Sequence, residues 1–350
     1  MFTTSVGVFV FGLLAAIGGN YAFVLTGFCV LASWGVFAAT GNTFGLDYLA
    51  FGPFMGPHIA FAGGVAAAIY ARYRGHLGDG KDVNTPLAGI GHPDILCVGA
   101  AFGIFGYLCQ IGIANIPWFG KHTDPVALTV LLSGLLARLI FGGVPGKGLF
   151  HGSLHNPELF HENATSFPAK IKPGPNGRWL EWQEKPSQLL TIGSLFGIFA
   201  GGASLFLAAN VGAYLTTRGL ANNLAAANAN SFCFGISAVI ILFLITNRNM
   251  PVQHHVTNIA GLAAVQFFPL LMGKTLTTYH WTYTSSWDSH TWGMATVALV
   301  IAAFFGVFTA GLGEFCARLW YNRGTSHIDP PAAAIWLGNT VVVSLATLFS

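Results

Sequence analysis

The chain has 350 residues, of which 53% are hydrophobic and only 8% are charged, with a formal net charge of +3. Soluble domains carry about one quarter charged residues, so this chain has too few charges to cover a water-exposed surface. The positive charges are dispersed and form no continuous basic stripe, which excludes nucleic acid as a partner. The composition predicts an all-α integral membrane protein whose main partner is the lipid bilayer.

Nine stretches predict membrane spans, because a helix of about 20 apolar residues crosses the hydrocarbon core. They lie at residues 5–37, 55–71, 94–115, 124–143, 187–214, 230–246, 255–273, 291–316 and 330–349. The first stretch is long for one crossing, and Gly18-Gly19-Asn20 can divide it into two helices, which makes ten spans the alternative. We expect a single membrane domain over 1–350, with 330–349 as its final helix.

Lys and Arg gather in alternate loops, and positively charged loops stay on the cytoplasmic side of a membrane. Eleven share one side: Arg72, Arg74, Lys81, Lys147, Lys170, Lys172, Arg178, Lys185, Arg248, Arg318 and Arg323. The opposite side receives Lys121, Arg218 and Lys274. We therefore expect the long loop 144–186 to be cytoplasmic and the protein to lie in the plasma (inner) membrane.

The chain shows a weak internal similarity between residues 1–143 and 187–316. His122-Thr123 before the fourth span matches His290-Thr291 before the eighth, and Phe11-Gly12 matches Phe196-Gly197. Many transporters consist of such repeats and hold their substrate at the repeat interface. A duplicated four-helix unit is one interpretation, and chance similarity between apolar segments is the other.

A motif of His, any residue, Asp and Pro occurs twice, each time at the start of a predicted span. The copies are His122-Thr123-Asp124-Pro125 and His327-Ile328-Asp329-Pro330. Asp is a favoured helix cap and Pro fits the first turn, so the motif can simply start a helix. Alternatively, the imidazole and the carboxylate bind a cation or pass a proton. The predicted topology places the copies on opposite faces, where they share one site only if a span re-enters.

Asp288 and His290 precede the eighth span, on the same predicted outer face as His122 and Asp124. If the chain is duplicated, these four residues converge there across a pseudo-twofold axis. Arg138 is the one cation inside a predicted span. It can extend to the membrane surface, bind an anionic substrate, or pair with a carboxylate such as Asp94 or Glu314.

Histidines on the predicted cytoplasmic face provide weak metal-ligand candidates. His151 and His155 have HxxxH spacing, and His254 and His255 are adjacent. This pattern is a poor fit to a metal-dependent membrane enzyme acting on lipid, because metal sites require fixed ligand geometry. We predict no cofactor.

Many spans and the lack of a soluble domain favour a secondary transporter or channel for a small polar solute or ion. Abundant His makes proton coupling through His and Asp plausible. The alternatives are the metal-dependent enzyme and a structural subunit of a membrane complex, and the Gly-rich helices also suit a homo-oligomer. The pathway candidates are His122, Asp124, Asp288, His290, Arg138, His327 and Asp329.

Overall fold

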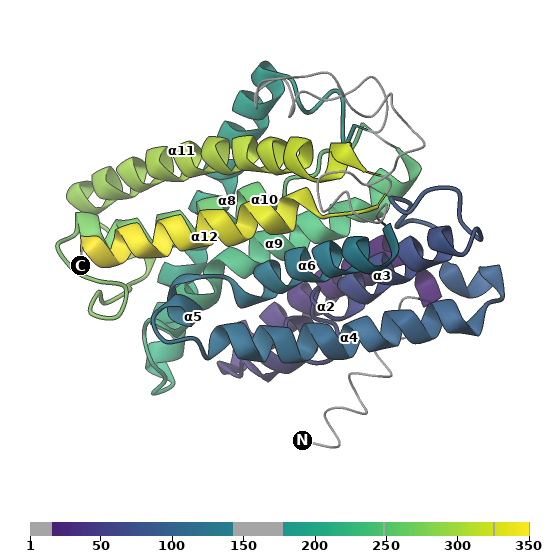
Figure 1. Ribbon diagram of the computed structural model, residues 1–350. Coiled ribbons are helices and arrows are strands. Elements are labelled where there is room, and N and C mark those ends of the chain that lie inside the picture. Colours follow the sequence, from purple (N-terminus) through teal and green to yellow (C-terminus); the bar gives the residue numbers. More distant parts are fainter. Residues whose placement is uncertain (1–15, 143–177, 248, 325, 350) are drawn as a thin grey trace.

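The computed structural model describes residues 16–142, 178–247, 249–324 and 326–349 (Figure 1). Within these ranges the regular elements are helices, apart from an isolated β-bridge between Gly80 and Ser326. Seven helical segments are long and apolar enough to cross a membrane. They are α2 (Gly19–Thr40), α4 (Pro93–Ala114), α6 with its final turn (Pro125–Gly142), α8 (Pro186–Thr217), α9 (Leu224–Thr246), α11 (Ser289–Leu319) and α12 (Pro330–Leu348).

Two further predicted spans are helices that do not meet this criterion, so the count of nine is not confirmed. They are α3 (Ala60–Tyr73), with 11 of 14 residues buried, and α10 (His254–Leu271), with 12 of 18 buried. Because neighbouring helices enclose them, neither needs an apolar surface all round. The short helix α5 (Phe119–His122) links α4 to α6.

The first predicted span does contain a break at its glycine pair. Helix α2 begins at Gly19, and Gly18 before it has a φ of 92°, a conformation that favours glycine. Most of the residues before this break lie outside the described part of the chain. A second pair of adjacent glycines, Gly201-Gly202, lies inside helix α8 without interrupting it, and a Cβ on Gly201 would come within 2.6 Å of that of Ala302.

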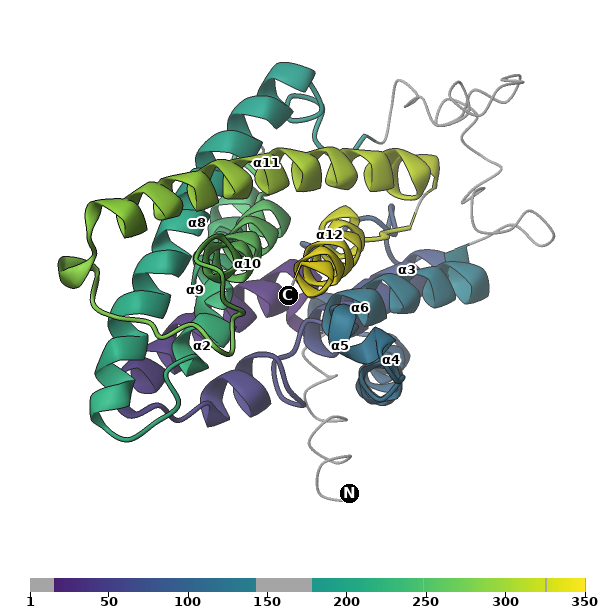
Figure 2. The ribbon, with the colours of Figure 1, turned by 90° about the vertical axis from the view of Figure 1, so that its left-hand side faces the viewer.

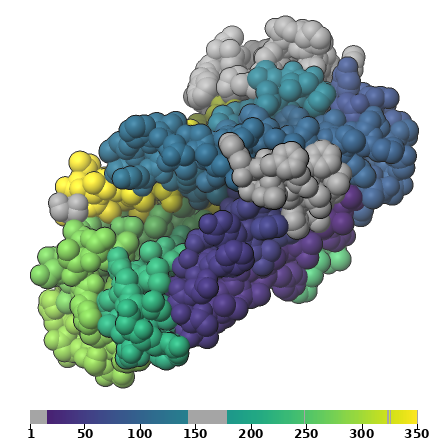
Figure 3. Space-filling view, turned by 90° about the horizontal axis from the view of Figure 1, so that it is seen from below, coloured from purple at the N-terminus to yellow at the C-terminus, as the bar shows by residue number. Residues whose placement is uncertain are grey.

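The helices form two neighbouring groups, joined by α2 and α12. Helices α3, α4 and α6 pack together, and so do α8, α9, α10 and α11. Helix α2 packs against α3 and α9, and α12 packs against α6, α10 and α11. Figure 2 shows α10 and α12 nearly end-on at the centre, with α11 crossing above them. The face in Figure 3 shows α2 (purple) between α4 (blue) and the green segments of the second group. This grouping follows the two expected repeat units, whose duplication stays a prediction.

Helix α12 begins inside the bundle rather than at its edge. A Cβ on Gly134, half-way along Pro125–Gly142, would lie 3.4 Å from the backbone oxygen of His327. At the other end of this antiparallel pair, the Thr123 and Thr340 hydroxyls lie 2.9 Å apart. The segment before α12 therefore enters the bundle to the depth of the middle of α6.

Candidate functional site

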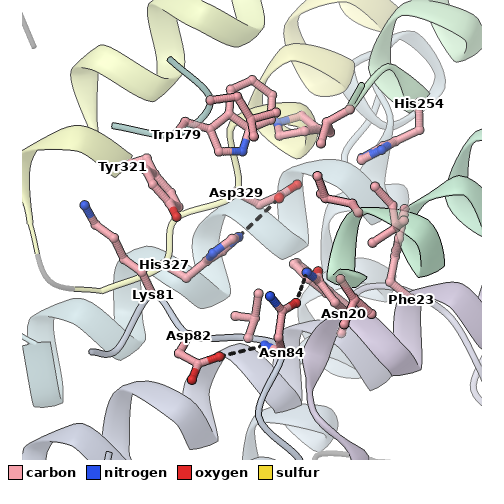
Figure 4. Close-up of a pocket in the computed structure, with 18 of the residues that line it drawn as sticks. Asn20, Phe23, Lys81, Asp82, Asn84, Trp179, His254, Tyr321, His327 and Asp329 are labelled. Carbon is pink, nitrogen blue, oxygen red and sulfur yellow. Dashed lines mark hydrogen bonds and ion pairs between the residues drawn. The ribbon is translucent and has the colours of Figure 1, made fainter. Parts of the chain in front are cut away.

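A first cavity of about 450 Å³ lies where four connecting segments meet (Figure 4). The segments follow α3, precede α8, precede α10 and follow α11, and they are among the Lys- and Arg-rich loops predicted to share one side. Its charged and titratable lining comprises Asp79, Lys81, Asp82, Arg178, His254, His327 and Asp329. The cavity is therefore polar and carries both signs of charge.

A second cavity of about 240 Å³ is lined by residues of the bundle helices. The aspartates of both His-x-Asp-Pro copies, Asp124 and Asp329, line it. The rest of its polar lining comprises Asn228, Asn230, Ser231, His254, Asn258 and Asn339. Among the described residues neither Lys nor Arg lines this cavity. It therefore combines two carboxylates with amide groups.

The two cavities share a wall, because Phe23, Phe61, His254 and Asp329 line both of them. The Phe23 ring centroid lies 5.7 Å from that of Phe61 and 4.8 Å from that of His254. The Phe61 ring in turn lies 5.7 Å from the ring of His327. Aromatic rings and titratable groups thus separate the first cavity from the second.

Both motif aspartates cap helices, as the capping interpretation predicts. Asp124 accepts a hydrogen bond from the Ala127 amide at 2.9 Å, and Asp329 accepts one from the Ala332 amide at 2.8 Å. We expected the two copies to share a site only if a span re-enters. The segment before α12 does enter the bundle, and both aspartates line the second cavity. Asp124 and Asp329 therefore each cap a helix and also line the second cavity.

The histidines of the two copies differ. His327 Nε2 lies 3.3 Å from Asp329 Oδ1, so the predicted His–Asp pair exists in the second copy (Figure 4). In the first copy, His122 Nδ1 lies 2.7 Å from the Trp118 backbone oxygen, and its ring stacks on Trp118 at 4.3 Å. Its contacts are to the segment around α5 and to Thr347 of α12 rather than to Asp124.

Asp288 and His290 lie at the start of α11 and line neither cavity. Asp288 accepts hydrogen bonds from the Thr291 amide and hydroxyl, which hold the pKa of its carboxyl below the usual value. The structure thus gives Asp288 local partners that differ from those of Asp124. The expected convergence of His122, Asp124, Asp288 and His290 stays a prediction.

Arg138 is fully buried at the end of α6 and does not line either cavity. Its guanidinium donates to the backbone oxygens of Trp320 at 2.8 Å and Ser326 at 2.7 Å, and to the Ser326 hydroxyl. Its proposed carboxylate partners have other cations: Asp94 pairs with Arg74, and Glu314 with Arg318. Arg138 therefore fastens α6 to the segment between α11 and α12.

Two of the four metal-ligand candidates lie in the described part of the chain. His254 and His255 are buried at the start of α10, with ring centroids 6.0 Å apart. His151 and His155 lie outside the described residues. Across the described part, no three His, Cys, Asp or Glu side chains form a group that could hold a metal ion.

Comparison with known proteins places almost the whole chain in one family. Residues 2–350 match the model of DUF7973, a family of unknown function. The chain belongs to DUF7973. No curated protein and no solved structure matches it. The function of this DUF7973 member must therefore be argued from its own cavities.

The sequence alone did not single out several residues of this DUF7973 site. Phe23 and Phe61 resemble the other phenylalanines of an apolar chain, and no feature of the neighbouring sequence indicates that they lie between two cavities. Asn258, a polar side chain within α10, accepts a hydrogen bond from Asn230 Nδ2 at 2.6 Å. A polar side chain in an apolar helix was the available signal, because such groups are costly in hydrocarbon unless they are used.

Proposed function

We propose that this DUF7973 member moves a small polar solute or ion across a membrane through the two cavities. The shared wall of Phe23, Phe61, His254 and Asp329 carries the proposal, because it leaves one polar chamber on each side. A path that opens to one chamber at a time is the arrangement that alternating access requires. The seven apolar helices supply the surrounding membrane domain.

The polarity of the second cavity supports a hydrophilic cargo. Carboxylates and amides inside an apolar bundle are costly, and they are usually found where a polar substrate or water passes. The wall also contains groups suited to proton transfer, since His327 pairs with Asp329 at 3.3 Å and His254 lies beside them. We therefore include proton coupling in the proposal.

The first cavity is proposed to open to the cytoplasm. Its lining includes Lys81 and Arg178, which belong to the positively charged set of loops, together with residues from the other segments expected on that side. The positive-inside rule assigns this end of the bundle to the cytoplasm. Loop 144–186 and the plasma (inner) membrane follow as parts of the same proposal.

A flux assay tests transport directly. The purified protein is reconstituted in liposomes and tested with ²²Na⁺, ⁸⁶Rb⁺, ¹⁴C-methylammonium, ¹⁴C-urea and a pH-sensitive dye in the lumen. We expect protein-dependent flux of at least one probe. Phe61→Trp should slow this flux several-fold by enlarging the wall, whereas Phe28→Trp should not, because Phe28 is 48% exposed on the outside of α2. Folded wild-type protein that moves none of the probes would overturn the proposal.

A further inference from the structure

The second cavity has the chemistry of a site for a positively charged ligand. We propose that it binds a small monovalent cation, of alkali-metal or primary-ammonium type, at one or the other of its two aspartates, Asp124 and Asp329. This inference rests on the proposed transport function and names the class of cargo or coupling ion. It goes beyond helix capping, which explains the positions of the two aspartates but not why both face one chamber.

The charge of the cavity supports a cation. Asp124 and Asp329 line it without a Lys or Arg among the described residues. The Asp124 carboxylate accepts a hydrogen bond from a backbone amide at the start of α6, where the helix dipole favours a negative charge. Whenever such a carboxylate ionises in an apolar bundle, it requires a compensating positive charge. A bound cation supplies that charge.

Asparagine side chains add neutral amide groups to the lining of the chamber. Asn228 Nδ2 donates to the Leu224 backbone oxygen at 3.0 Å, and Asn230 Nδ2 donates to Asn258 Oδ1 at 2.6 Å. Each of these bonds uses one of the two N–H donors of the amide, and the Oδ1 atoms of Asn228 and Asn230 are carbonyl oxygens of the kind that a cation binds. Carboxylate and carbonyl oxygens are the ligands that hard cations prefer.

His254 gives an independent indication that a ligand occupies this region. Its side chain lines both cavities and is only 6% exposed, yet its Nδ1 atom has no hydrogen-bond partner within the described part of the chain. A buried polar atom without a partner is costly, and a bound ligand or its hydrating water would satisfy it. Figure 4 shows His254 at the edge of the first cavity, on the same side as Phe23, which also lines both cavities.

The separation of the aspartates favours a monovalent over a divalent ion. Thr123 contacts Thr340, about ten residues into α12, which places the backbones of Asp124 and Asp329 about 15 Å apart along the helix pair at 1.5 Å per residue. A single ion therefore meets one carboxylate at a time, whereas protein sites for divalent cations usually combine several charged ligands. Asp329 also lines the first cavity, so it can receive the ion from Asp124 and release it on the other side.

The three helix-capping aspartates provide a matched set of variants. Asp124→Asn and Asp329→Asn remove charges from the cavity, and Asp288→Asn removes the charge of a helix-capping aspartate outside both cavities. Asn is as good a cap as Asp, so all three variants are expected to fold. Binding of ²²Na⁺, ⁸⁶Rb⁺ and ¹⁴C-methylammonium to the purified full chain in detergent is measured by scintillation proximity.

We expect saturable binding of at least one of the three cations by wild type and Asp288→Asn. Affinity should fall at least ten-fold in Asp124→Asn, and Asp329→Asn should also bind more weakly. The inference is overturned if folded wild type binds none of the cations saturably, or if Asp124→Asn binds as wild type does. Binding in detergent needs no transport, so cation binding without liposome flux would refute transport alone. Flux of urea without cation binding would refute the cation site alone.

Discussion

The rings of Phe23 and His254 lie 4.8 Å apart in the wall between the two cavities. Phe23 also contacts Phe61 and Phe234, each with ring centroids 5.7 Å away. Phe23 is therefore the side chain that joins the aromatic part of the wall to its titratable part.

Replacing Phe23 with Ala should open the wall. Deleting a ring from a packed aromatic cluster leaves space that water and small ions can enter, and we expect flux in liposomes to rise several-fold. Phe28→Ala is the matched control on the same helix, because Phe28 faces outward. Equal flux in both variants would show that Phe23 is not part of the barrier.

Lys81 should make cation flux depend on pH. Burial lowers the pKa of Lys81 to about 8, with Asp79 opposing this shift and Arg138 adding to it. The ammonium, 4.6 Å from the Tyr321 ring centroid, is thus charged at pH 7 and becomes neutral as the pH rises through about 8. Loss of this charge removes repulsion in the first cavity, so wild-type cation flux should increase between pH 7 and 9.

Two Lys81 substitutions separate charge from packing. Lys81→Gln should give high flux already at pH 7 and flatten the response, whereas Lys81→Arg should keep flux low up to pH 9 because Arg stays protonated. Lys274→Gln, in an exposed loop, should behave as wild type. A pH response that survives in Lys81→Gln would assign the titration to another group.

Arg138 should contribute to stability rather than to the path. Arg138→Gln removes a charged donor from the backbone oxygens of Trp320 and Ser326, which we expect to cost about 3 kcal/mol in the free energy of unfolding. Arg138→Lys should recover only part of this stability, because one ammonium group cannot reach all the acceptors that the planar guanidinium bonds. Thermal unfolding in detergent measures both, with the exposed Arg218→Gln as control. If the Arg138→Gln protein folds with normal stability but gives no flux, Arg138 belongs to the transport path and not to the structural framework.

The contact between α4 and the segment before α3 should tolerate no side chain at Gly106. A Cβ there would lie 1.8 Å from the His58 backbone oxygen, so Gly106→Ala must push two backbones apart. We expect a loss of about 1–3 kcal/mol, as for other overpacked sites. Gly112, on the same helix, has open space around it, and Gly112→Ala should leave the unfolding temperature unchanged or higher.

The proposed orientation can be measured with introduced cysteines in a cysteine-free chain. Gly78 lies in the exposed loop after α3, and Lys274 in an exposed loop on the opposite predicted side. In intact cells an impermeant maleimide should label Lys274→Cys but not Gly78→Cys, because the positively charged loops are expected to be cytoplasmic. The opposite pattern would invert the assignment of both cavities.

Local features of the sequence predicted the helices well. Runs of apolar residues located helices, seven of which are long and apolar enough to cross a membrane. Asp-Pro pairs marked the starts of α6 and α12, and Gly18-Gly19 marked the start of α2. Each of these signals acts over one or two helical turns, through hydropathy, capping or backbone freedom. The i,i+4 pair of Glu314 and Arg318 was predictable for the same reason.

Which capping aspartates line a cavity was decided only by the tertiary structure. Asp124, Asp288 and Asp329 cap helices in the same way, yet only the first and the last face the second chamber. The difference arises because α12 starts level with Gly134, deep in the bundle, and so turns its cap toward α6 and α10. Helix-to-helix packing at that depth depends on contacts between residues about 200 positions apart, such as Thr123 and Thr340, which no local pattern encodes.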